Sequence, residues 1–209
     1  MAITAKTAKK PPNRTPIRPY VETIVEHLRE AAEELSTEEL EEFVETLQSG
    51  KRIFVMGAGR SGLVAKAFAM RLMHLGFTTF VVGETTTPAL DKYDAVVAIT
   101  GSGRTRSILE LGKTASEIGA RLALVTSRRD SPMAEMATAV LMVKGPPPQA
   151  QIPADYEKRQ LRGEYRSLAP LGTLFETAAM VVLDGVIAHL MERKGISEKE
   201  LKARHAVLE

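Results

Sequence analysis

Residues 57–62 (Gly-Ala-Gly-Arg-Ser-Gly) have the residue types of an anion-binding turn. They lie between an apolar run and a helical pattern, which indicates a turn from a strand into a helix. Glycine lets a ligand approach the backbone, and the first N–H groups of a helix can donate to phosphate. A tight turn that only needs glycine is the structural alternative. The spacing also matches the G-x-G-x-x-G fingerprint, so the phosphate could belong to a dinucleotide or to a small substrate.

A second turn of similar composition covers residues 100–107 (Thr-Gly-Ser-Gly-Arg-Thr-Arg-Ser). It also follows an apolar strand pattern and precedes a helical one. A helix cap needs one hydroxyl, whereas this turn has four that can donate hydrogen bonds to phosphate oxygens. The two turns together predict a cradle for one compact phosphate. The candidate substrate-binding residues are Gly59, Ser61, Thr100, Gly101, Ser102, Gly103, Arg104 and Thr105.

Glu176 is the candidate for proton transfer, because it lies within a long apolar pattern that we expect to be a helix. A rotation of 100° per residue places it near Met180 and Leu183. A carboxylate on such a face must be paired, protonated or functional, and burial would raise its pKa toward that of a general base. With Pro170 at the helix start, Glu176 would lie too deep to cap the helix. A buried Glu bonded to a loop is the structural alternative, and Asp184 is the competing carboxylate.

The strands that would position these turns are nearly continuous apolar runs, which suit strands covered on both faces. Strands that alternate with helices imply a parallel sheet. We therefore predict an α/β fold, a five-stranded doubly wound parallel sheet of flavodoxin-like order flanked by helices. With residues 78–83 in an outer strand, the two turns would face one crevice. The predicted strands are 52–57, 78–83, 95–100, 121–126 and 139–144, and the helices between them are 61–75, 104–118 and 131–137.

Further helices flank the predicted sheet. Two N-terminal helices are expected over residues 20–35 and 37–49, and the second has Ser36 and Glu39 spaced as in a capping box. Residues 1–18 are basic and proline-rich, and we expect a disordered tail before a single domain over 19–209. An irregular segment over 145–169 precedes two C-terminal helices, 170–192 and 197–203.

The composition excludes several classes of protein. The 28 basic and 26 acidic residues give a formal net charge of +2, which is weak support for nucleic acid binding. There is no Cys, so thiolate chemistry is excluded. No uninterrupted apolar run reaches the roughly 18 residues of a membrane span. The N-terminus lacks an apolar signal core, so we expect no membrane association and a cytoplasmic location.

A dinucleotide site would need an acidic residue at the end of the second strand to bind a ribose, and Glu84 stands there. However, the second hydroxyl-rich turn has no role in that scheme. The sheet is also expected to end after five strands, with no substrate domain to follow. We therefore favour a small phosphorylated substrate.

Five phrases of the chain are informative together: 57–62, 83–88 (Gly-Glu-Thr-Thr-Thr-Pro), 160–164 (Gln-Leu-Arg-Gly-Glu), 170–176 (Pro-Leu-Gly-Thr-Leu-Phe-Glu) and 204–209 (Arg-His-Ala-Val-Leu-Glu). In this order they resemble the sugar isomerase (SIS) domain family, which binds phosphosugars. Within it they are most similar to the 6-phospho-3-hexuloisomerase subfamily. Two positions depart from the subfamily pattern, with Arg104 in place of the usual Glu and Val207 in place of the usual Asn. Arg104 adds positive charge beside the expected phosphate, and neither change removes a presumed catalytic group.

The resemblance implies an isomerase that interconverts D-arabino-3-hexulose 6-phosphate and fructose 6-phosphate through an enediol(ate), as in the ribulose monophosphate pathway of formaldehyde assimilation. It assigns proton transfer to Glu176 and adds His205 as a second catalytic residue, commonly supplied by a neighbouring subunit. It also implies a homotetramer with sites near the subunit interfaces, no cofactor and no metal. Another SIS-type phosphosugar aldose–ketose isomerase and a non-catalytic sugar phosphate sensor are the alternatives.

Overall fold

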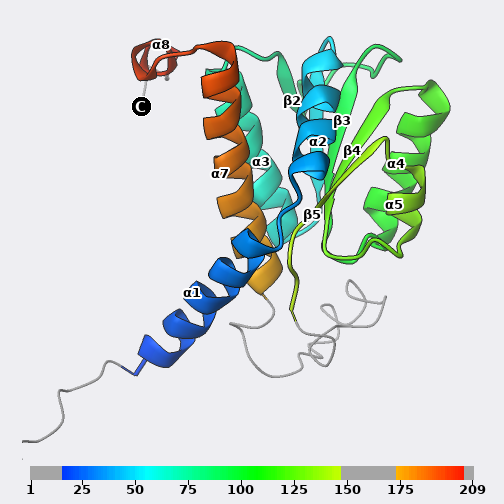
Figure 1. Ribbon diagram of the computed structural model, residues 1–209. Coiled ribbons are helices and arrows are strands. Elements are labelled where there is room, and N and C mark those ends of the chain that lie inside the picture. The colour runs from blue at the N-terminus through cyan, green and yellow to red at the C-terminus, as the bar shows by residue number, and fades with distance from the viewer. Residues whose placement is uncertain (1–15, 147–172, 205–209) are drawn as a thin grey trace, which may run out of the picture.

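The computed structural model describes residues 16–146 and 173–204, which form a five-stranded sheet flanked by helices (Figure 1). The strand order is β2-β1-β3-β4-β5, and all four neighbouring pairs are parallel. This confirms the predicted doubly wound α/β fold with flavodoxin-like order. The strands are β1 (Ile53–Gly57), β2 (Thr79–Val81), β3 (Ala95–Ile99), β4 (Arg121–Thr126) and β5 (Ala139–Met142).

Both faces of the sheet are covered, because alternate strand residues enter two separate hydrophobic cores. Ile53 and Val55 of β1 enter the core formed with α2 and α3. Phe54 and Met56 enter the core formed with α4 and α5. Coverage on both faces explains why the strands are continuous apolar runs in the sequence. The covering helices are α2 (Thr37–Ser49), α3 (Arg60–His74), α4 (Arg106–Ile118) and α5 (Pro132–Met136).

α7 (Leu174–Lys194) packs against α3, and α1 (Arg18–Glu33) packs against α7 (Figure 1). By length and composition alone α7 could cross a membrane, although it contains no uninterrupted apolar run of that length. Its apolar side chains enter the same hydrophobic core as those of α2 and α3. The apolar character of α7 is explained by its position, because it packs against α3 and against α1. The short helix α8 (Glu198–Ala203) follows it.

The two residues of the predicted capping box at the start of α2 have different partners. The Ser36 hydroxyl accepts a hydrogen bond from the N–H of Glu39 at 3.3 Å, as predicted. The Glu39 carboxylate accepts instead from the N–H of Met142 at 2.7 Å and forms an ion pair with Arg129. This carboxylate therefore joins α2 to the end of β5 rather than closing a reciprocal capping box.

The start of α7 differs from the sequence-based prediction. The helix begins at Leu174 with Thr173 as its N-cap, so Glu176 lies in the first turn and not two turns inside. The first turn of a helix stabilises a negative charge, so a carboxylate is favoured at this position. Pro170, the predicted helix start, and most of the predicted irregular segment 145–169 lie outside the described residues. So do residues 1–15 of the predicted tail, whereas α1 already begins at Arg18.

Candidate active site

The two glycine-rich turns leave neighbouring strands at the same edge of the sheet. β1 and β3 are paired in parallel, and their last residues, Gly57 and Ile99, are register partners. α3 and α4 begin shortly after the turns. The predicted crevice therefore has both turns side by side at the carboxyl ends of the strands, where open α/β sheets bind their ligands.

Close packing fixes the first turn. Gly59, the N-cap of α3, has φ 57° and ψ −128°, a conformation that residues with a side chain rarely adopt. A Cβ at Gly57 would lie 2.7 Å from the carbonyl of Ser61, and a Cβ at Gly62 would lie 2.8 Å from the carbonyl oxygen of Gly57. The strand and helix thus meet closely enough to exclude any side chain. This contact fixes the position of Ser61, which is 7% exposed.

Hydroxyl groups line the second turn as the sequence predicts. The hydroxyl oxygens of Thr100 and Thr105 lie 3.3 Å apart. Ser102 is exposed, and its hydroxyl accepts a hydrogen bond from the N–H of Arg104 at 3.2 Å. Gly103 is buried against Ser131, where no side chain would fit. Ser102 is therefore an exposed hydroxyl of this turn that a ligand can reach.

The helices that begin at the crevice have no side-chain N-cap, a feature that they share with α1 and α7 but not with α2, α5 and α8. Ser36, Ser131 and Ser197 each accept a hydrogen bond at the start of α2, α5 and α8. The N-caps of α3 and α4, Gly59 and Thr105, make no such side-chain hydrogen bond. The first N–H groups of α3 and α4 are therefore not occupied by an N-cap side chain, as binding of an anion there requires.

Arg104 has another partner in the structure. Its guanidinium group donates a hydrogen bond to the carbonyl oxygen of Asp130 at 2.5 Å, and the residue is exposed. The expected extra positive charge beside the phosphate is thus held by the loop that follows β4.

The first turn of α7 touches both glycine-rich turns with adjacent residues. The ring of Phe175 lies where a side chain of residue 101 would be, 2.9 Å from an ideal Cβ on Gly101. The hydroxyl of Ser61 lies close enough to the carboxylate of Glu176 to lower the pKa of that group. The proposed base and both halves of the phosphate cradle therefore meet at one place.

Burial decides the protonation behaviour of Glu176. It raises the pKa of the carboxyl above its ordinary value, and this effect exceeds three that lower the pKa. These are the residue's own backbone N–H, the positive charge of Arg60 and the nearby hydroxyl of Ser61. One carboxylate oxygen, Oε2, is buried and has no hydrogen-bond partner among the described residues. Such an oxygen can accept a proton from a substrate.

The carboxyl end of β4 and the residue after it contribute positioning residues that the sequence did not reveal. The carbonyl oxygen of Gly101 accepts hydrogen bonds from the hydroxyl of Thr126 at 3.2 Å and from the hydroxyl and N–H of Ser127 at 2.8 and 3.1 Å. These bonds fix the carbonyl group of Gly101, and with it the second turn, to the end of β4. The available signal was a polar Thr-Ser pair at the end of a buried strand that lies next to β3.

Other predicted groups lie elsewhere or outside the described residues. Asp184 is exposed, so it is a poor competitor to Glu176. Glu84, the residue expected to hold a ribose, forms an ion pair with Lys66 of α3 at 2.6 Å. His205 lies outside the described residues. In the part of the chain that the structure describes, no group of three His, Cys, Asp or Glu side chains could hold a metal ion.

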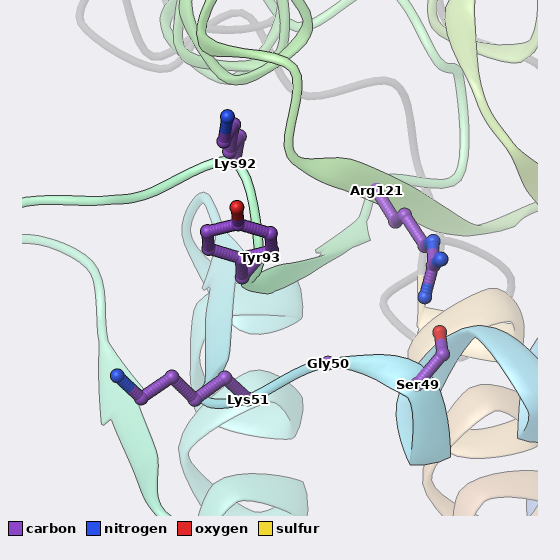
Figure 2. A pocket seen from close by; sticks show the side chains of 6 residues that line it. All are labelled: Ser49, Gly50, Lys51, Lys92, Tyr93 and Arg121. Atoms are coloured by element: carbon purple, nitrogen blue, oxygen red, sulfur yellow. The ribbon is translucent and has the colours of Figure 1, made fainter.

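A hollow of about 390 Å³ lies at the opposite edge of the sheet (Figure 2). Its basic residues come just before β1, just before β3 and at the start of β4, so it is at the amino ends of the strands. The hollow is therefore remote from the two glycine-rich turns and from Glu176. The candidate active site lies at these turns, where the hydroxyl groups and the carboxylate are found. The residues that line the hollow are Ser49, Gly50, Lys51, Lys92, Tyr93 and Arg121.

The fold and the paired turns define a member of the SIS domain family. Residues 46–156 match the SIS domain, and the chain belongs to this family. It is 37% identical to a 3-hexulose-6-phosphate isomerase of Bacillus subtilis, over 91% of this chain and 97% of that protein. A crystal structure described as a hypothetical protein is 45% identical, with a TM-score of 0.80 over 92% of this chain and 97% of its own. A Methanococcus jannaschii structure, from which a 3-hexulose-6-phosphate isomerase function was inferred, is 32% identical, with a TM-score of 0.71 over 93% of this chain and all of its own.

Proposed function

We propose that the protein is a 3-hexulose-6-phosphate isomerase (6-phospho-3-hexuloisomerase), which interconverts D-arabino-3-hexulose 6-phosphate and fructose 6-phosphate. The observation that carries this proposal is the partly buried carboxylate of Glu176, whose Oε2 has no hydrogen-bond partner among the described residues, beside a turn suited to phosphate. Four relatives with this name, 34–41% identical to the chain, support this substrate over other phosphosugars.

The reaction moves a ketone between C3 and C2, and one base can perform it. Glu176 removes the proton from C2 of the 3-ketose, and the electrons form the enediolate between C2 and C3. The same carboxyl group returns a proton to C3, while a proton passes between the two oxygens. The raised pKa of Glu176 suits this role, because the group must both accept and donate the proton near neutral pH.

The phosphate lies three carbons from the reacting centre, so its role is to orient the chain of the sugar. In this proposal the N-termini of α3 and α4, together with Ser61 and Ser102, bind the phosphate oxygens. Binding energy at a remote group can fix the reacting atoms, and well-oriented intramolecular steps gain on the order of 7 kcal/mol or more.

His205 would complete the site from a neighbouring subunit of a homotetramer. Arg204 donates a hydrogen bond to the carbonyl of His74, at the C-terminal end of α3, at 3.1 Å. Ser61 stands 13 residues earlier on the same helix, which corresponds to roughly 20 Å. Residue 204 is therefore far from the site of its own subunit, which supports a role across an interface. His205 would polarise the carbonyl or assist opening of the fructose 6-phosphate ring. We place the enzyme in the cytoplasm, in the ribulose monophosphate pathway.

The position of solvent deuterium in fructose 6-phosphate tests this function. The protein is incubated with fructose 6-phosphate in deuterated water, and the sugar is followed by NMR. Removal of the C3 proton places deuterium at C3. An isomerase that forms an aldose would place it at C1, and a sensor or a dinucleotide enzyme without its cofactor would place none.

A further inference from the structure

Gly145 packs directly on Ser127, one of the residues that fix the second turn. An ideal Cβ on Gly145 would lie 2.5 Å from the hydroxyl oxygen of Ser127 and 2.6 Å from its Cβ, which is too close for any side chain. Gly145 is not among the glycines with a positive φ, so its backbone conformation does not require glycine. The space that Ser127 occupies therefore explains why glycine stands at this position.

The hydroxyl of Ser127 has a defined partner. It donates a hydrogen bond to the carbonyl oxygen of Gly101 at 2.8 Å, which ties the residue after β4 to the turn proposed to bind phosphate. A hydroxyl carries one proton, so a rotation away from Gly101 would break this bond. A hollow of about 280 Å³ is lined by both Ser127 and Gly145, so a displaced serine side chain has space into which it can turn.

Helix α1 fixes the position of Lys144, the residue before this glycine. The buried His27 donates a hydrogen bond from Nε2 to the carbonyl oxygen of Lys144 at 3.1 Å. The amine of Lys144 forms ion pairs with Glu30, at 3.2 Å, and with Glu34. These contacts with one helix restrict movement of the segment away from Ser127. A methyl group added at the next residue is therefore expected to displace the side chain of Ser127 rather than the segment.

We propose that Gly145 and Ser127 are positioning residues for the substrate phosphate. The glycine leaves the room that Ser127 needs to hold the carbonyl of Gly101, and the next residue is Ser102, whose hydroxyl is proposed to bind phosphate. Displacement of Ser127 would thus move the phosphate turn and weaken affinity more than it slows the chemical step at Glu176. This inference rests on the proposed phosphate site.

Calorimetric titration with inorganic phosphate tests the inference without turnover. Gly145→Ala should weaken phosphate binding about 2- to 12-fold, the effect of one hydrogen bond between neutral groups. Ser127→Gly should weaken it by a similar factor, since it also removes the hydroxyl. In the Ser127→Gly background, Gly145→Ala should have no further effect, because the atoms that the added Cβ would strike are absent. With fructose 6-phosphate, the KM of Gly145→Ala should rise by the same factor while kcat changes less.

A matched control and the stability of each variant separate positioning from a general effect on the fold. Gly185→Ala, an exposed change on α7 with nothing within 4 Å of the added Cβ, should leave phosphate affinity unchanged. A Gly145→Ala protein with a lower Tm but wild-type phosphate affinity would overturn the inference. Losses of affinity that simply multiply in the double variant would also overturn it, because they would show that Gly145 does not act through Ser127.

The positioning role and the proposed function can fail separately. An inactive protein with the predicted pattern of phosphate affinities would refute only the isomerase. An active protein in which Gly145→Ala binds phosphate as wild type does would refute only the positioning role. A wild type that binds no phosphate would refute the phosphate site, and the positioning role with it.

Discussion

The ring of Phe175 occupies the space beside Gly101 that a side chain would need, and a Cβ on Gly101 would lie 2.9 Å from the ring. The next residue is Glu176, whose carboxyl pKa is lowered by the nearby hydroxyl of Ser61 in the other turn. The contact between Gly101 and the ring of Phe175 therefore helps to set the distance between the proposed phosphate cradle and the proposed base.

Gly101→Ala should displace the first turn of α7 and reduce both stability and turnover. Overpacking of this kind costs roughly 1–3 kcal/mol, which urea denaturation measures. Gly185→Ala is the matched control, because this exposed residue of α7 has nothing within 4 Å of an added Cβ. The control should leave kcat unchanged and increase stability by about 0.5–1 kcal/mol. Equal kinetic effects of both changes would show that the contact does not position Glu176.

Ser102→Ala should mainly weaken substrate binding, because the lost hydroxyl is proposed to bind phosphate far from the reacting carbons. A hydrogen bond to a charged group contributes about 1.5–3 kcal/mol, so KM should rise roughly 10- to 150-fold with a smaller change in kcat. Ser116→Ala, an exposed change farther along α4, should have no effect. Unchanged affinity in Ser102→Ala would remove the second turn from the phosphate site.

Glu176→Gln should make the fold more stable at neutral pH. A carboxyl whose pKa is raised on folding stabilises the fold fully below its unfolded pKa, and this contribution is lost as pH rises through the folded pKa. Above that point the ionised, partly buried carboxylate destabilises the protein, and glutamine carries no charge. We expect a gain on the order of 1 kcal/mol at pH 7–8.

Thermal unfolding of wild type and Glu176→Gln between pH 4 and pH 8 measures this effect. The difference in Tm should shrink toward the acidic end of the range. Asp184→Asn, an exposed change on the same helix, should show no such trend. A variant less stable than wild type at pH 8 would contradict burial as the cause of the raised pKa.

Removal of residues 205–209 should abolish most of the activity and leave phosphate binding intact. Arg204 is kept in this truncation, since it binds the carbonyl of His74 and therefore has a structural contact of its own. Loss of an acid or base group typically costs 10²- to 10⁴-fold in rate. Full activity of the truncated protein would refute a catalytic role for His205.

Mixed oligomers can show which subunit supplies His205. His205→Ala protein and Glu176→Gln protein are each expected to be nearly inactive. After subunit exchange, sites with both residues intact form only when the histidine acts in the neighbouring subunit. Recovered activity is thus expected, and its absence despite proven exchange would place His205 and Glu176 of the same chain together.

Much of the fold could be predicted from the sequence, because strands covered on both faces are continuous apolar runs and α2 starts at a recognisable serine. The candidate phosphate turns also lie where their flanking patterns place them. The roles of Thr126 and Ser127 could not be predicted, since they depend on β4 lying next to β3. The partner of Arg104 could not be predicted either, because a long side chain reaches several acceptors and only the folded loop selects one.

The depth of Glu176 in its helix was the main error about the site. Pro170, which precedes the apolar pattern, suggested that the helix begins at residue 170, whereas the described helix begins at Leu174. The conclusion about burial still holds, because contact with Ser61 and the packing of Phe175 bury the first turn.

Deuterium exchange at C3 of fructose 6-phosphate by Glu176→Gln tests the central claim most directly. Sugar phosphate binding is measured on the same sample by calorimetry. The account predicts that wild type exchanges the C3 proton and that Glu176→Gln binds the sugar normally but exchanges it at least 10²-fold more slowly. Exchange by Glu176→Gln at the wild-type rate would show that another group transfers the proton.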